Sequence, residues 1–315
     1  MEVLDRDYMI QSNNLMKIVN ILFGKFYSFK VWFSYREKIA NWFQVWLKAN
    51  SLVGKLSFKF FGMRIVKFVK IVRSDGLRIN LPIDKIDEGP SWAFIGDEYL
   101  MNLGKYFNDF CLKDCDIVID AGAHVGTFSL ACVCVNRNIK IYAIEPSESN
   151  VKILKKNVVD NNISFNQFHI LKLGLLDKNC EIDFNSGHSS TTGSVDLVGV
   201  YKEKGSQKLS FSRKSSSVIK IECISLSNLF SDKKIASCRL LKLDCEGSEY
   251  RILQGMDIMY WNMIDYMVIE AHPSQDGSPL ELKTLIESRN FDVFTESLGN
   301  GCYEFYCKNI RLSRI

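Results

Sequence analysis

The sequence predicts an α/β fold built on a doubly wound, mostly parallel sheet, with an extension before it. An apolar strand from Ile117 runs into a glycine turn and a helix, and a second strand follows at 139–144. Short apolar stretches with strand character recur farther along the chain, which suits the alternation of strands and helices in such folds. A chain of 315 residues with 47% hydrophobic residues can bury a core of this kind.

Two regions can be distinguished along the chain: an extension of residues 1–90 and a main domain of residues 91–315. Residues 14–70 interleave Phe, Trp and Ile with Lys, a pattern that predicts one or two amphipathic helices. We favour helices that cap the main domain and keep their lysines in solvent. Helices that rest on an anionic membrane or dock a partner protein are the alternative.

The apolar pattern places the individual elements in order. A β-hairpin is predicted around Ser74-Asp75-Gly76, because apolar residues flank an Asp-Gly turn. The segment 187–217 is rich in Ser, Thr, Gly and Lys, and we expect a loop there. The other predicted elements are helices at 98–112, 149–159 and 280–289, and strands from 117 and at 139–144, 168–171, 219–224, 239–243, 266–269 and 302–307.

Charge and cysteine content narrow the class of protein. The net charge of +4 names no partner, although Lys and Arg cluster between Lys17 and Arg73. Ten cysteines without paired CxxC spacing indicate reduced thiols rather than a disulfide framework or a zinc site. The acidic start with Glu2 and Asp5 is unlike a signal peptide, and charged residues interrupt the apolar stretches of the extension. We therefore expect a cytoplasmic protein, with contact to a membrane surface as the alternative.

The most informative segment is the strand and turn Ile117–Ser129, with the sequence IVIDAGAHVGTFS. Gly122 and Gly126 have no Cβ atom, so the backbone of the turn can approach a ligand closely. The helix that follows offers unpaired N–H groups to polar or anionic groups, and the carboxylate of methionine would fit there. The candidate cofactor contacts in this turn are Asp120, Gly122, Ala123 and Gly126.

An acidic residue ends the next strand. Glu145 and Pro146 follow the apolar residues Ile141–Ile144, at the position where doubly wound folds bind the ribose of a nucleotide. The distance of about 20 residues from the glycine turn is the one that a βαβ crossover imposes. A nicotinamide enzyme uses the same topology, but its GxGxxG pattern would need glycine at Ala121 and Ala123. This departure favours S-adenosylmethionine as the nucleotide.

Two later strands also end in acidic groups. The segment LLKLDCEGSE opens from an apolar strand into three carboxylates, and the segment MVIEAH ends in Glu270 and His272. Ligands of open α/β sheets bind beyond the carboxyl ends of the strands, so these groups are predicted to face the same cleft as the glycine turn. The candidate catalytic residues are Asp244, Glu246 and His272, with His272 as the general base. A Mg²⁺ ion held by Asp244, Glu246, Glu270 and His272 is the alternative.

In this order, the motifs VIDAGAHVGTFS, IEP, LLKLDCEGSEYRIL and IEAH resemble the FkbM family of methyltransferases, from about Glu98 to His272. The resemblance implies a seven-stranded class I (Rossmann-like) sheet, S-adenosylmethionine as the cofactor, and methyl transfer to oxygen, often on sugars or hydroxylated natural products. His124 stands where the family often has Asn, a difference that the turn tolerates. The positions that match the family's site are Asp120, Gly122, Gly126, Glu145, Asp244, Glu246 and His272.

These observations predict an enzyme that methylates a hydroxyl group of a sugar, glycan or other small acceptor. The hydroxyl proton would pass to His272 or Asp244 while the oxygen attacks the methyl group in line. A non-catalytic protein of the same fold, docked to a membrane or partner through the basic extension, is one alternative, although the intact acidic strand ends argue against it. An RNA methyltransferase is another, but the sequence lacks the Asn-Pro-Pro-Tyr-like strand end that base methylation suggests, so nucleic acid is not the expected partner.

Overall fold

The computed structural model describes residues 33–34, 36–41, 68–82, 93–185 and 218–314 of the chain. The chain divides into two compact units between Ala93 and Phe94. The helices predicted within 14–70 lie largely outside the described residues, and the loop predicted at 187–217 lies almost entirely outside them. In the part of the chain that the structure describes, no helix has the length and the apolar character that crossing a membrane requires.

The first unit contains the predicted β-hairpin. Strands β1 (Phe68–Val72) and β2 (Arg78–Pro82) pair antiparallel. Gly76 adopts a φ of 90° in the turn, and the carboxylate of Asp75 accepts the N–H of Leu77 at 3.1 Å. An Asp-Gly turn between two apolar stretches therefore forms the hairpin that the sequence predicts.

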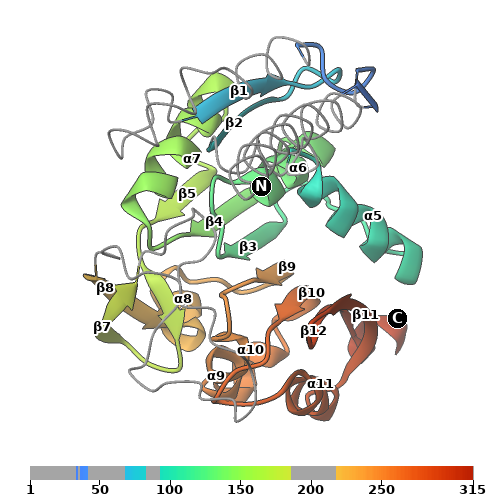
Figure 1. The fold of residues 1–315 in the computed structure, drawn as a ribbon. Helices are drawn as coiled ribbons and strands as arrows, with labels where there is room; N and C mark the ends of the chain where they lie inside the picture. Colours follow the sequence, from blue (N-terminus) through green and yellow to red (C-terminus); the bar gives the residue numbers. More distant parts are fainter. Residues whose placement is uncertain (1–32, 35, 42–67, 83–92, 186–217, 315) are drawn as a thin grey trace, which may run out of the picture. The chain divides into compact units, whose positions relative to one another are not determined.

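The second unit is built on a seven-stranded sheet (Figure 1). In spatial order its strands are β11 (Phe291–Gly299), β12 (Cys302–Asn309), β10 (Ile264–Ala271), β9 (Cys238–Leu243), β3 (Ile117–Ala121), β4 (Lys140–Ile144) and β5 (Phe168–Leu171). β12 is antiparallel to its neighbours, and the other strands are parallel to one another. The chain enters the sheet at β3 and adds strands first on one side and then on the other, which confirms the predicted doubly wound fold.

Four helices cover one face of this sheet and share its core. The buried residues Leu229, Leu253 and Ile286 of these helices pack in one cluster with Met267 and Ile269 of β10. Since side chains alternate between the two faces of a strand, the residues between these positions point to the opposite face. The four helices are α8 (Leu226–Asp232), α9 (Glu249–Gln254), α10 (Ile258–Trp261) and α11 (Pro279–Ser288).

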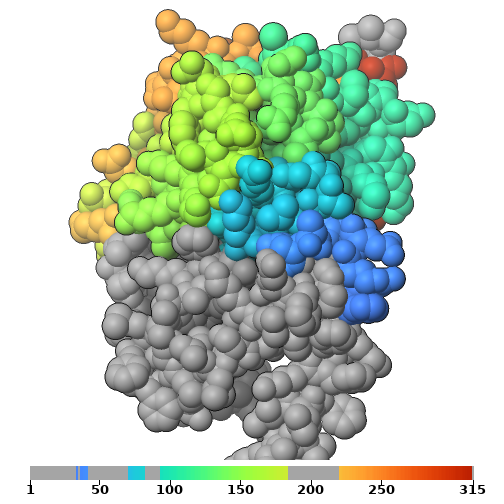
Figure 2. All heavy atoms as spheres, turned by 90° about the horizontal axis from the view of Figure 1, so that it is seen from above, coloured from blue at the N-terminus to red at the C-terminus, as the bar shows by residue number. Residues whose placement is uncertain are grey.

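The opposite face is covered by helices that precede and follow the first strand. The ring of Phe107 contacts Tyr266 of β10, the neighbour of the core residue Met267. A Cβ on Gly96 would lie 2.7 Å from the Cα of Phe128, so glycine permits the close approach of the first two helices. The helices are α5 (Ile95–Tyr106), α6 (Thr127–Val135) and α7 (Glu148–Asp160). One side of α5 and one side of α7 are exposed to solvent (Figure 2).

The start of α11 shows how local sequence fixes an element. The hydroxyl of Ser278 accepts the N–H of Glu281 at 3.3 Å, and the carboxylate of Glu281 accepts the N–H of Ser278 at 2.7 Å. Pro279 occupies the first helical position, where no N–H is needed. This capping box begins the helix one residue before the predicted start.

A second, three-stranded sheet follows β5 along the chain. Its strands, in spatial order, are β6 (Gly174–Leu176), β8 (Val218–Ser225) and β7 (Cys180–Asn185). The predicted strand at 219–224 is therefore present, but it belongs to this sheet. The seventh strand of the main sheet is β11, in which Phe291 is the only buried residue, and the apolar pattern did not predict it.

β11 and β12 form a hairpin at one edge of the main sheet. Gly299, Asn300 and Gly301 follow in its turn with positive φ angles. Because β12 runs against the other strands, this turn lies at the edge where the parallel strands end. A Cβ on Gly301 would lie 3.7 Å from the ring of Pro273, two residues after β10. The hairpin turn therefore borders the region beyond the carboxyl end of β10.

Candidate active site

The turn between β3 and α6 is fixed by the chain's own packing. Gly122, His124 and Gly126 adopt φ angles of 73°, 52° and 86°. A Cβ on Gly122 would lie 1.8 Å from the carbonyl oxygen of Asp244, and a Cβ on Gly126 would lie 2.1 Å from Cδ1 of Leu154. We predicted that the missing side chains make room for a ligand, but the chain's own atoms occupy that space. Both glycines are therefore required by the fold itself.

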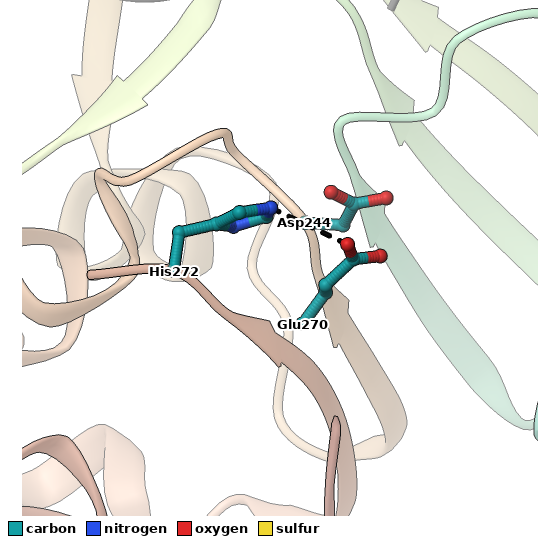
Figure 3. A group of neighbouring side chains, drawn as sticks. All are labelled: Asp244, Glu270 and His272. Atoms are coloured by element: carbon teal, nitrogen blue, oxygen red, sulfur yellow. Dashed lines mark ion pairs between the residues drawn. The ribbon is translucent and has the colours of Figure 1, made fainter. Parts of the chain in front are cut away.

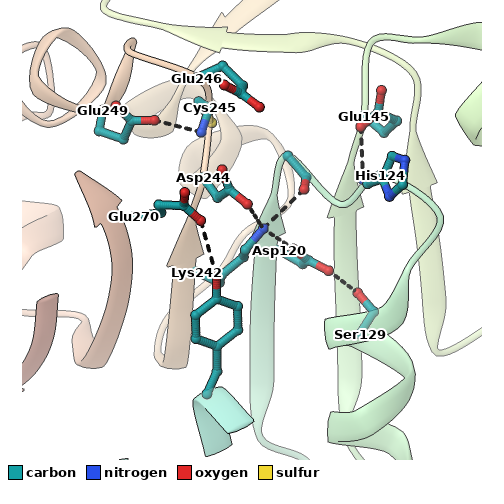
Figure 4. Close-up of polar contacts among 12 residues, drawn as sticks. Asp120, His124, Ser129, Glu145, Lys242, Asp244, Cys245, Glu246, Glu249 and Glu270 are labelled. Atoms are coloured by element: carbon teal, nitrogen blue, oxygen red, sulfur yellow. Dashed lines mark hydrogen bonds and ion pairs between the residues drawn. The ribbon is translucent and has the colours of Figure 1, made fainter. Parts of the chain in front are cut away.

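Asp120 lies one residue before the end of β3 and has only internal contacts among the described residues (Figure 4). Its Oδ2 accepts a hydrogen bond from the hydroxyl of Ser129 at 2.6 Å, and its Oδ1 lies 3.8 Å from Nζ of Lys242. Burial raises the pKa of Asp120, although Lys242 and Ser129 act in the opposite direction. Of the other predicted cofactor contacts, Ala123 is also buried, whereas Pro146 is partly exposed. Asp120 thus supports the turn from inside the protein.

Glu145 follows β4 and reaches the same turn (Figure 4). Its Oε2 accepts the N–H of His124 at 2.9 Å, and its Oε1 accepts the N–H of Ser147 at 2.8 Å and the side-chain amide of Asn150 at 3.2 Å. Burial raises the pKa of Glu145 to about 7, and these hydrogen bonds act against that rise. A carboxylate can accept about four hydrogen bonds. Glu145 therefore ties β4 to the glycine turn and keeps the capacity to accept a further donor.

The segment after β9 folds around the carboxylate of Glu249, a residue that is 1% exposed. Oε1 of Glu249 accepts the N–H of Cys245 at 2.7 Å, and Oε2 accepts the N–H of Gly247 at 3.1 Å. Glu246 adopts a φ of 52° within this loop, and its side chain is 38% exposed. The sequence pattern assigned a role to Glu246 but none to Glu249, because it does not reveal which carboxylate is buried.

His272 follows β10 and lies among three carboxylates. Its Nδ1 is 3.2 Å from Oε1 of Glu249, and its Nε2 is 3.3 Å from Oε1 of Glu270 and 3.9 Å from Oε2 of Glu246. Burial acts to lower the pKa of His272, but the hydrogen bonds to Glu249 and Glu270 outweigh it and raise the pKa to about 11. This pKa favours a proton on both ring nitrogens at neutral pH. An imidazolium has no lone pair to accept a proton, so the predicted role of His272 as general base requires the ring to lose one proton first.

Four carboxylates lie across the ends of neighbouring strands, and we call them the acidic row: Asp244, Glu270, Glu304 and Glu296. Glu304 of β12 pairs with Glu270 of β10 on one side and with Glu296 of β11 on the other. Asp244 and Glu270 come directly after the last paired residues of β9 and β10, Leu243 and Ile269. Like charges opposite one another are destabilising. Tyrosine hydroxyls donate to three members of the row: Tyr99 to Glu270, Tyr306 to Glu304 and Tyr106 to Glu296.

Asp244, Glu270 and His272 each place one possible metal-binding atom within 4.8 Å of the others (Figure 3). Glu246, which we predicted as a fourth ligand, is not part of this group. A proton and a metal ion compete for the same lone pair of the His272 ring. The raised pKa of the His272 ring favours the proton, so an ion bound to this group would have to displace that proton.

Lys242 connects the glycine turn to the acidic row (Figure 4). Its Nζ donates to the carbonyl oxygen of Gly122 at 3.1 Å and to Oδ2 of Asp244 at 3.0 Å. No role was predicted for Lys242 from the sequence. The signal that could have found it is a lysine within an otherwise apolar strand, since a buried ammonium group requires partners.

Several proteins similar to this chain carry the name methyltransferase. Methyltransferase 1 of Beauveria bassiana is 27% identical over 187 residues, which cover 58% of this chain and 75% of that protein. The 31-O-demethyl-FK506 methyltransferase FkbM of Streptomyces tacrolimicus is 24% identical over 208 residues, which cover 59% of this chain and 76% of that protein. The crystal structure of methyltransferase FkbM from Methylobacillus flagellatus is 17% identical with a TM-score of 0.44, and the alignment covers 67% of this chain and 50% of that one.

A family model described as the methyltransferase FkbM domain matches residues 120–293, more than half of the chain. The matched segment begins at Asp120, at the end of β3, and runs into β11. It contains the glycine turn, Glu145, the loop after β9 and His272, which are the parts that the fold brings to one edge of the sheet. The chain therefore belongs to the FkbM methyltransferase family.

Proposed function

We propose that the chain is an S-adenosylmethionine-dependent enzyme that methylates a hydroxyl group of an uncharged sugar, glycan or other small acceptor. The observation that supports this proposal most strongly is the position of the glycine turn and Glu145 at the same sheet edge as the acidic row. Lys242 donates hydrogen bonds to both Gly122 and Asp244, so the glycine turn after β3 and the start of the acidic row after β9 lie at the ends of neighbouring strands. Doubly wound sheets bind their ligands beyond this edge.

The residues around the glycine turn suit an adenosyl cofactor. Glu145 directly follows β4, at the position where an acidic residue accepts hydrogen bonds from ribose hydroxyls in such folds, and it can accept a further donor. The first turn of α6 follows Gly126 and presents backbone N–H groups that suit the carboxylate of methionine. Bound S-adenosylmethionine supplies an already activated methyl group. The tasks left to the chain are to orient the acceptor and to accept its proton.

Glu246 is the residue that we assign to accept the proton. Burial, together with the negative charge of Asp244, raises the pKa of Glu246 to about 7, and a base is most effective when its pKa lies near the working pH. The side chain is partly exposed, so an acceptor can reach it. The imidazolium of His272 lies 3.9 Å from Glu246 and orients the carboxylate through its charge.

The acidic row supports an acceptor without negative charge. Its four carboxylates are partnered by tyrosine hydroxyls and by three cations, the His272 ring, Lys105 and Lys242. Lys242 is also shared with Asp120. A phosphate group brought close to this row would meet like charge, whereas hydroxyl groups can donate to carboxylate oxygens. The same argument weighs against the RNA methyltransferase alternative.

Calorimetric titration with S-adenosylmethionine tests the cofactor assignment. We expect Glu145→Gln to weaken binding by about tenfold or more, because a hydrogen bond to a charged group contributes about 1.5–3 kcal/mol. The matched control is Glu148→Gln, three residues farther along the chain on the exposed start of α7, and it should bind like the wild type. Equal affinity of Glu145→Gln would remove the ribose role, and absence of binding by the wild type would refute the cofactor assignment.

A second experiment tests the acceptor and the base. The protein is incubated with S-adenosylmethionine and a panel of neutral sugars and glycans, each paired with its phosphorylated form, and methylated products are detected by mass spectrometry. We expect transfer to neutral members, and a loss of about 10²–10⁴-fold in turnover for Glu246→Gln with unchanged cofactor affinity. Preference for phosphorylated acceptors would contradict the role of the acidic row, and normal turnover of Glu246→Gln would contradict its role as base.

A further inference from the structure

A lysine lies in the interior of the main sheet. Lys242 is the fifth of six residues of β9 and is 5% exposed. Burying an ammonium group is costly unless oxygen atoms replace the water that it loses. The structure provides these oxygens from the ends of two neighbouring strands, β3 and β9.

The ammonium group of Lys242 is surrounded by three oxygens. It donates to the carbonyl oxygen of Gly122 and to Oδ2 of Asp244, and Oδ1 of Asp120 lies 3.8 Å away. Burial acts to lower the pKa of Lys242, but the charges of Asp244 and Asp120 outweigh burial and leave the pKa raised. The side chain therefore stays charged at neutral pH and bonds to both strand ends at once.

The backbone brings the same two strand ends into contact. The N–H of Asp244 donates to the carbonyl oxygen of Ala121 at 3.1 Å, and the Asp244 carbonyl oxygen lies where a Cβ of residue 122 would be. The N–H groups of Gly122 and Ala123 donate to the carbonyl oxygen of Ile144 in β4. The glycine turn is thus held by β4 on one side and by β9 on the other, and Lys242 supplies the side-chain part of the second contact.

We infer that Lys242 is a positioning residue that holds the glycine turn and Asp244 in a fixed relation, so that cofactor and acceptor meet at a set distance. The inference rests on the proposed function in one respect, because it takes the turn as the place of the cofactor. The coupling between the two segments is a property of the chain alone. It can therefore be tested without any ligand.

The test compares four full-length proteins: wild type, Asp120→Asn, Lys242→Met and the double variant Lys242→Met/Asp120→Asn. Lys242→Met alone leaves the buried carboxylate of Asp120 without its cation and can fail to fold. The double variant removes both charges, and Asp120→Asn is its reference. Hydrogen exchange is followed by mass spectrometry in peptides that cover 120–126, 243–249 and, as an internal control, 302–309.

We expect both site peptides of the double variant to exchange at least about tenfold faster than in Asp120→Asn, with the control peptide unchanged. Its affinity for S-adenosylmethionine should fall by about tenfold relative to the same reference. Unchanged exchange, faster exchange in one site peptide alone, or equal acceleration of all three peptides would overturn the inference. If the wild type does not bind S-adenosylmethionine, the proposed function fails, and the exchange rates still decide the role of Lys242.

Discussion

Replacing Gly122 by alanine tests whether the ends of β3 and β9 are in direct contact. The new methyl group would lie 1.8 Å from the carbonyl oxygen of Asp244, at a backbone φ of 73°. An alanine in the left-handed region costs about 1–2 kcal/mol, and forcing an extra methyl group into packed structure costs about 1–3 kcal/mol. The clashing atom is backbone, so a side-chain rotation cannot relieve it. We therefore expect Gly122→Ala to lose about 2–5 kcal/mol of unfolding free energy.

The matched control is Gly299→Ala in the β11–β12 turn. Gly299 has a φ of 86°, and a Cβ there would meet nothing within 4 Å, so this variant carries the backbone strain without the clash. Urea denaturation of both variants gives the difference, which should be about 1–3 kcal/mol in favour of Gly299→Ala. Equal losses would show that β3 and β9 are not in the close contact on which the site depends.

Three further outcomes follow from the site. The pKa of His272 in the folded protein lies above its unfolded value of 6.5, so its stabilising effect is complete below about pH 6 and is lost towards pH 11. The urea midpoints of wild type and His272→Gln should therefore converge as the pH rises. A difference that stays constant with pH would refute the imidazolium. Since that proton occupies the ring, neither EDTA nor millimolar Mg²⁺ should change the unfolding temperature, whereas a rise with Mg²⁺ would assign the site to a metal. Gly126→Ala should destabilise the protein by about 1–4 kcal/mol, and Leu154→Ala should be less harmful in that background than in the wild type, because it removes the clashing methyl group; simple additivity would contradict this contact.

Much of the fold follows from patterns that are local in the sequence. The strand of residues 168–171 has the predicted bounds. β4 begins one residue later than predicted and ends as predicted, and α7 is one residue longer than predicted at each end. These elements are apolar along their length or carry a helical apolar pattern, so their burial can be read from the residues themselves. β11 escaped prediction because it lies at the edge of the sheet and buries Phe291 alone.

The candidate site, too, can be predicted from the sequence only in part. The sequence shows which residues end the strands, and Asp244, Glu246, Glu270 and His272 do gather at one edge. Whether a given group is free to react depends on neighbours far away in the chain. Glu249 lies 23 positions before His272 and raises the pKa of its ring, and Lys242 reaches Gly122 across 120 positions. Such contacts arise only from the folded arrangement of strands.

The reversal of β12 determines which part of the chain borders the candidate site at this end of the sheet. In a sheet of parallel strands alone, each strand is connected to the next by a crossover, usually a helix. Because β12 is antiparallel, a hairpin turn, Gly299–Gly301, lies beside Pro273 at the edge where the parallel strands end. A Cβ on Gly299 would meet no atom within 4 Å, although its φ of 86° favours glycine, and insertions at such turns cost little stability. The length of this tip can therefore change while the strand ends that carry the candidate site stay as they are.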